Sequence, residues 1–153
     1  MSGSNDESEL RTALTAFETS VATPVVSGEL GDWADTVRKA WSEASAQIDR
    51  QIRELHPRQY EEISNADAAL FQQIELLKAE DSAIEQDRDR LDRAVKRVAD
   101  HVPKLEPDEA KAEPHVESLV EDAMAFVGRV RKQEVAVQTW FMEAFNRERG
   151  GGD

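Results

Sequence analysis

The sequence contains no cysteine, so disulfides, thiolate metal sites and cysteine nucleophiles are excluded. Glycine and proline are also scarce, with 7 and 5 residues among 153, and no useful alternating pattern of a β-strand occurs. No apolar run approaches the ~20 residues that span a bilayer. The N-terminal residues 1–7 have neither the basic region nor the apolar core of a secretory signal. These absences favour an all-α, cytoplasmic domain without membrane contact.

Positive charge is the minority, because 19 lysines and arginines face 32 acidic residues, which gives a net charge of −13. Sequence-independent binding to nucleic acid or anionic lipid needs a surplus of basic residues. The composition therefore argues against both partners. An acidic surface is compatible with a basic protein partner, and the sequence leaves the oligomeric state open.

Apolar residues at steps of three and four predict four amphipathic helices. We expect these helices at residues 7–22, 32–55, 67–102 and 114–149, with a short helical turn at 58–65. Asp32 is expected to cap the second helix. Pro57 is expected to end that helix, because a proline disfavours helical geometry at the residue before it, His56.

Four such helices predict a single domain at 7–149 with an antiparallel up-down four-helix bundle fold. Residues 1–6 are expected to be disordered, 103–113 to form a mobile connection with Pro114 in the first turn of the last helix, and 150–153 to form a flexible tail. Gly128 lies inside the last helix, where glycine costs about 1 kcal/mol relative to alanine. Close approach of another helix is one reason for a glycine there.

Polar residues interrupt two of the apolar stripes. Asp81 and Arg88 lie in the stripe of the long helix, and Gln133 and Glu134 lie in that of the last helix. On the second helix, Asp49 and Gln51 border the stripe. A buried carboxylate is costly unless it is protonated, hydrated or paired. We therefore expect Asp81, Arg88 and Glu134 to form a buried polar layer in which the guanidinium meets the acids.

The run Tyr60-Glu61-Glu62-Ile63, followed by Leu70, Ile74, Leu77 and Ala79-Glu80, resembles the middle of bacterial hemerythrin-like (HHE cation-binding) domains. The C-terminal Glu143-Ala144-Phe145 with Gly150-Gly151-Gly152-Asp153 resembles the end of one branch of the same family. The resemblance extends over residues from about 10 to 153. It implies a hemerythrin-like four-helix bundle that holds a non-haem di-iron centre through histidines and carboxylates.

The matching positions of this chain depart from the family pattern. Where the resemblance places His-x-x-x-Glu, the chain has Asp81 and Glu85, and where the family has a histidine in the last helix the chain has Gln133, followed by Glu134. The histidine of the second helix falls near Asp49. No matched position holds histidine. His56, His101 and His115 are instead expected at helix ends, as solvated or capping residues without ligand spacing.

The leading hypothesis is a non-enzymatic hemerythrin-like bundle without cofactor or catalytic residue, whose ligand layer has become a polar core layer. Its role is then structural or lies in protein interaction. The alternative is a divalent-cation-binding bundle. In that case five side chains supply ligands to Fe, Mn or another divalent cation such as Mg²⁺ or Ca²⁺: Asp49, Asp81, Glu85, Gln133 and Glu134.

Overall fold

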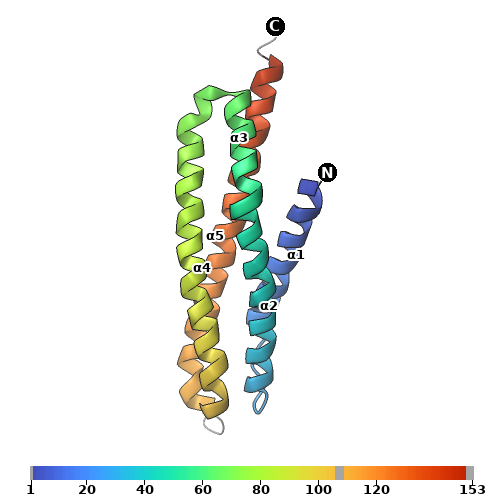
Figure 1. Ribbon diagram of the computed structural model, residues 1–153. Helices are drawn as coiled ribbons and strands as arrows, with labels where there is room; N and C mark the ends of the chain where they lie inside the picture. Colours follow the sequence, from blue (N-terminus) through green and yellow to red (C-terminus); the bar gives the residue numbers. More distant parts are fainter. Residues whose placement is uncertain (1, 106–108, 151–153) are drawn as a thin grey trace.

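The computed structural model describes the backbone of residues 2–105 and 109–150, and the side chains of residues 7–101 and 110–146. Within these residues the secondary structure is entirely helical, which confirms the all-α prediction. Four rods lie side by side as a bundle (Figure 1). Their elements in chain order are α1 (Ser2–Ala22), α2 (Leu30–Arg50), the π-helical turn η1 (Gln51–Leu55), α3 (His56–Ala66), the 3₁₀ turn η2 (Ala68–Leu70), α4 (Phe71–Leu105) and α5 (Glu109–Gly150).

The second rod continues through Pro57, so the prediction that a helix ends there is wrong. The π-helical turn η1 joins α2 to α3, and His56 keeps helical backbone angles of φ −59° and ψ −46°. A proline inside an α-helix lacks an N–H, and its ring clashes with the carbonyl four residues earlier. The wider π-helical turn directly before Pro57 shifts the backbone hydrogen-bond pattern by one residue, because the His56 N–H donates to the Gln51 carbonyl, five residues earlier. The rod thereby extends along α4 and α5 to the upper end of Figure 1.

Other helix boundaries differ from those expected. The backbone of α1 begins at Ser2, within the segment 1–6 that was expected to be disordered, and Met1 lies outside the described residues. The α2 helix begins at Leu30 with Glu29 at its N-cap, so the prediction that Asp32 caps it is wrong. Asp32 lies in the first turn, where its negative charge still interacts favourably with the helix dipole.

The connection expected at 103–113 is helical over most of its length. The α4 helix extends to Leu105 and α5 begins at Glu109, while residues 106–108 lie outside the described part. Pro114 is therefore inside α5 and not in its first turn, so it removes one backbone hydrogen bond of the helix and its ring crowds the carbonyl four residues earlier. Of the tail expected at 150–153, Gly150 ends α5 and the other residues lie outside the description.

The apolar core consists of two separate clusters. The larger one joins α1, α2, α4 and α5 around Phe17, Trp41 and Val127. The smaller one joins α3, α4 and α5 around Tyr60 and Ile74, and none of the described side chains of α1 belongs to it. The shorter α1 accounts for this division, because its N-terminal end lies well below the upper end of the bundle (Figure 1). The upper part of the molecule is therefore built from three rods.

Two further features of the described helices concern the surface. None of these helices combines the length and apolar character required to cross a membrane. In α5, a Cβ atom added at Gly128 meets nothing within 4 Å. Close approach of another helix of the same bundle therefore does not explain this glycine.

Helix capping gives a direct test of the observed boundaries. Asp67 lies at the start of η2, and its Oδ1 accepts a hydrogen bond from the Ala69 N–H at 3.0 Å. We expect Asp67→Ala to lower the free energy of unfolding by about 1 kcal/mol, because it removes this cap. Asp32→Ala should cost only about 0.3 kcal/mol, the lower end of helix-dipole contributions. Urea denaturation of both variants measures the difference, and equal losses would contradict the boundaries.

Candidate functional site

A layer of polar side chains separates the two apolar clusters. On the second rod, Gln51 and His56 lie between Ile48 of the larger cluster and Tyr60 of the smaller one. On α4, Asp81 lies between Leu77 and Ile84, and on α5, Gln133 and Glu134 lie between Val130 and Val137. Gln51, His56, Asp81 and Gln133 are buried. Three rods therefore place polar side chains at one level of the core.

His56 is the centre of this layer. Its side chain is 1% exposed, and both ring nitrogens contact carboxylates. Nδ1 lies 2.9 Å from each carboxylate oxygen of Asp81 on α4. Nε2 lies 2.8 Å from Oε1 of Glu134 on α5. Because each nitrogen can donate only when it carries a proton, this geometry suits the doubly protonated imidazolium.

Neutral donors complete the environment of the two acids. The Tyr60 hydroxyl donates to Asp81 Oδ2 at 2.7 Å, and Gln133 Nε2 donates to Asp81 Oδ1 at 2.9 Å and to the Leu77 carbonyl at 2.9 Å. Gln51 Nε2 donates to Glu134 Oε2 at 2.7 Å. Buried atoms without a partner do occur among the described side chains, at Gln59 and Gln73, but neither belongs to the layer. Each carboxylate oxygen in the layer thus has a protein donor.

The charges of the layer are coupled. Burial alone lowers the pKa of His56, but the hydrogen bonds and negative charges of Asp81 and Glu134 outweigh it and raise the pKa to about 9. Burial raises the pKa of Tyr60, and the hydrogen bond to Asp81 adds to this effect. At pH 7 His56 is therefore a cation between two acids, and Tyr60 is a neutral donor.

One edge of the layer reaches the surface. The side chain of Glu134 is 18% exposed and lines a groove of ≈ 420 Å³ between α1 and α5. Leu10 and Leu14 of α1 line the same groove. The layer is therefore dry around His56 and Asp81 and meets solvent beside Glu134.

The structure brings together only part of the residue set expected from the sequence. Asp81, Gln133 and Glu134 meet in the layer, but Arg88 does not join them, so the expected pairing of its guanidinium with these acids is wrong. Arg88 Nη1 instead bonds Asp49 Oδ1 at 2.8 Å, at the margin of α2 and α4. The guanidinium lies too far along α4 from Asp81, and His56 supplies the cation in its place.

The cation-site alternative loses two of its five ligands in this geometry. Asp49 is bound to Arg88 and also to Arg53, at 2.9 Å. Glu85 is half-buried one turn beyond Asp81 and has no hydrogen bond or ion pair to another described side chain. Across residues 7–101 and 110–146, no group of three or more histidines and acids is arranged to hold a metal ion.

The residues of the layer do not fit a di-iron centre. Metal-bound imidazole needs a nitrogen lone pair, whereas both nitrogens of His56 face carboxylates as hydrogen-bond donors. His101 and His115 are exposed and lie outside the layer. The acids that remain already accept hydrogen bonds from Tyr60, Gln133 and Gln51. The donor set is that of an ionic hydrogen-bond network.

Comparison with known proteins adds no relative: no protein family, curated protein or solved structure matches this chain.

His56 is the functional residue that the sequence interpretation missed. The expectation that it is a solvated or capping histidine at a helix end is wrong, because it is among the most buried side chains. The missed signal is its spacing: His56 follows Ile52 by four residues and precedes Tyr60 by four. A helix that continues through Pro57 places all three on one face. The rule that proline ends a helix hid this pattern.

The raised pKa of His56 predicts how stability depends on pH. The folded state holds the His56 proton more tightly than the unfolded state, whose pKa is near 6.5. The resulting stabilisation, on the order of 3 kcal/mol, is complete below pH 6.5 and is lost as the pH rises through 9. We expect the melting temperature to fall between pH 6.5 and 9.5.

The matched control is the comparison of His56→Gln with His101→Gln. The first variant should melt at a temperature that changes little over this range, and the second, at an exposed histidine, should follow the parent. Parallel pH profiles for the parent and His56→Gln would contradict the assignment of the proton to His56.

The ionic layer also predicts that removing the His56 cation lowers the free energy of unfolding more than removing the Arg88 cation. His56→Leu leaves two acids without their cation and should cost about 3–5 kcal/mol. Arg88→Leu should cost about 1 kcal/mol or less, because its partner Asp49 is 40% exposed and can be hydrated. Chemical denaturation of the two variants measures both values. A larger loss for Arg88→Leu than for His56→Leu would contradict the layer.

Proposed function

We propose that this chain is a non-enzymatic antiparallel up-down four-helix bundle of the hemerythrin-like type, in which an ionic layer replaces the metal ligands and the role lies in protein association. The observation that carries the proposal is the engagement of both His56 nitrogens by Asp81 and Glu134. An imidazolium held in this way is neither a metal ligand nor a general base at neutral pH.

The position of the layer supports the link to hemerythrin-like domains. The resemblance in sequence places ligands at Asp81 on the long helix and at Gln133 and Glu134 on the last helix, and these side chains meet at one level of the core. The second rod contributes His56 to the same level. A polar layer at this place is consistent with a former ligand layer that now fixes the register of the helices.

The pairing of the polar side chains in the core favours a function at the surface of the bundle. The described reactive groups of the core are paired with one another, and the larger grooves are open and lined by paired charges such as Asp92 with Lys96. A rigid bundle with an internally satisfied core presents its helix faces to other molecules. We therefore assign a binding role and no reaction.

Metal loading tests this proposal. The full chain is incubated with Fe²⁺, Mn²⁺, Mg²⁺ or Ca²⁺, freed of excess ion, and analysed for bound metal and for melting temperature. We expect no stoichiometric metal and an unchanged melting temperature, because an ion that binds only the folded state must stabilise it.

The His56→Gln variant is the control for a site hidden by the imidazolium. If that variant or the parent binds one or two ions per chain and melts at a higher temperature with them, the layer is a cation site and the proposal fails.

A further inference from the structure

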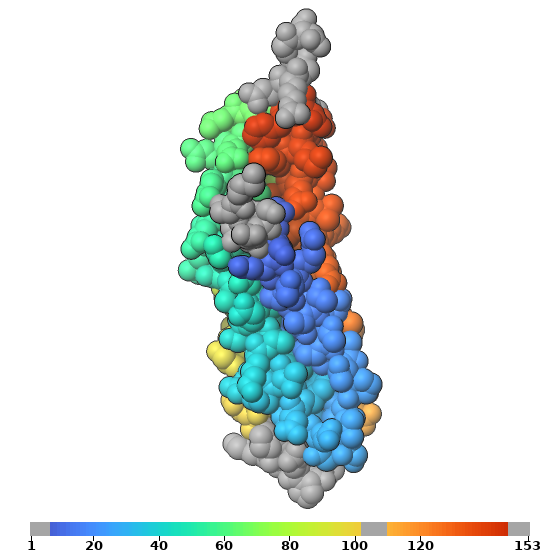
Figure 2. Space-filling view, turned by 90° about the vertical axis from the view of Figure 1, so that its right-hand side faces the viewer, coloured from blue at the N-terminus to red at the C-terminus, as the bar shows by residue number. Residues whose placement is uncertain are grey.

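The outer face of α5 carries a continuous seam that no part of the described bundle covers. The seam consists of exposed residues at alternating steps of three and four: Ala125, Gly128, Lys132, Val135, Thr139, Met142 and Asn146. This spacing is the heptad pattern by which one helix packs along another. Val135 and Met142 are 65% and 63% exposed, which gives the seam two large apolar side chains. Figure 2 shows the upper half of α5 at the surface beyond α1.

The same face lacks the acidic residues that dominate the rest of the chain. Between Asp122 and Glu143, the acidic residue of α5 is Glu134, whose carboxylate is turned inward to His56 and Gln51. Of the seam residues, Lys132 carries the one charge. Two molecules with a net charge of −13 each repel one another over most of their surfaces. This face is where two copies meet with the least repulsion.

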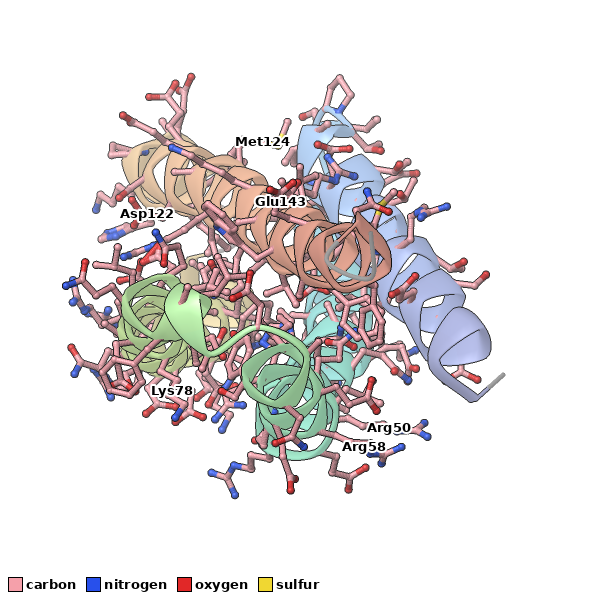
Figure 3. The ribbon with its side chains drawn as sticks, turned by 90° about the horizontal axis from the view of Figure 1, so that it is seen from above. Arg50, Arg58, Lys78, Asp122, Met124 and Glu143 are labelled. Carbon is pink, nitrogen blue, oxygen red and sulfur yellow. The ribbon has the colours of Figure 1, made fainter. Side chains whose placement is uncertain are left out.

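Gly128 is the second, independent sign of a partner helix. A glycine within a helix costs about as much as any non-proline residue can cost there, yet its missing Cβ makes room for no part of the same bundle. A helix of another molecule that packs on this face would approach closely at Gly128. Met124, beside the seam, projects from the outer side of α5, whereas Asp122 points to the side nearer α4 (Figure 3).

We propose that the seam of α5 is the interface of a homodimer in which the α5 helices of two copies pack antiparallel. This inference rests on the proposed role in protein association and names the partner as a second copy of the chain. A parallel pair places each seam residue opposite its own copy, with the two Lys132 ammonium groups at one level, whereas the antiparallel pair offsets them by about 4.5 Å along the axis. The antiparallel arrangement is therefore favoured.

Antiparallel packing also matches small residues to large ones. Layers then pair Ala125 with Met142 of the second copy, Gly128 with Thr139, and Lys132 with Val135. The symmetry axis passes between residues 133 and 134, so the interface is the same patch on both copies. The seam spans about 32 Å, which puts the contact at the lower end of protein interface sizes, where association is weak and transient.

Analytical ultracentrifugation of the full chain, at concentrations from about 1 µM to about 1 mM, tests the dimer. Val135→Lys should weaken association at least tenfold, because it places an ammonium group opposite Lys132 of the second copy. Leu76→Lys is the matched control, since Leu76 is 71% exposed on α4, outside the seam. It should leave the Kd unchanged. Raising the ionic strength from about 0.05 to about 0.3 M should tighten the dimer by screening its charges.

Gly128→Leu distinguishes an effect on association from an effect on folding, because the substitution should stabilise the fold and weaken the dimer. In dilute solution the variant should melt about 2–4 °C higher, since leucine favours the helix and its Cβ meets open space. At high concentration it should stay monomeric, because the larger side chain blocks the close approach.

Single cysteines test the direction of the helices in a chain that has none of its own. A short thiol–thiol crosslinker should join two Val135→Cys chains, whose residues lie about 4.5 Å apart along the axis. It should not join Met142→Cys chains, separated by about 25 Å, nor Leu76→Cys chains. A monomer at every concentration, a dimer insensitive to Val135→Lys, or crosslinking through position 142 would overturn the proposal. None of these outcomes changes the metal result that tests the proposed function.

Discussion

The structure depends on the protonated imidazole of His56, which joins α3 to α4 and α5 through its two nitrogens. With Asp81 and Glu134 it forms a buried group of two acids and one cation. Removing any one member of this group leaves an uncompensated charge in the core. The three rods therefore have one register in which this layer is satisfied, and the apolar clusters on either side pack in that register.

The layer also connects the local backbone to the proposed role. The π-helical turn at 51–55 carries the second rod through Pro57 and turns His56 inward. The imidazolium, the acids and their neutral donors satisfy one another within the described polar layer. The proposed binding role then uses the outside, where the seam of α5 combines exposed apolar side chains with an absence of acidic ones.

The periodicity of the sequence predicts the all-α fold and the inward positions of Asp81 and Gln133, because steps of three and four determine which side of a helix is buried. The periodicity does not predict which residue supplies the cation of the polar layer. The rule that proline ends a helix placed His56 in solvent, and the π-helical turn that overrides the rule has no clear sequence signature. Arg88 was preferred as the cation because it shares a stripe with Asp81. Axial distance along α4 and the nearness of Asp49 decide against that pairing.

The central claim is the charge of one side chain, and nitrogen-15 NMR of the His56 ring measures it most directly. The account predicts that at pH 7 both ring nitrogens carry protons, with nearly equal shifts typical of imidazolium, and that they titrate near pH 9. A neutral ring with one unprotonated nitrogen at pH 7, or a ring whose signals shift on addition of a divalent metal ion, would contradict it.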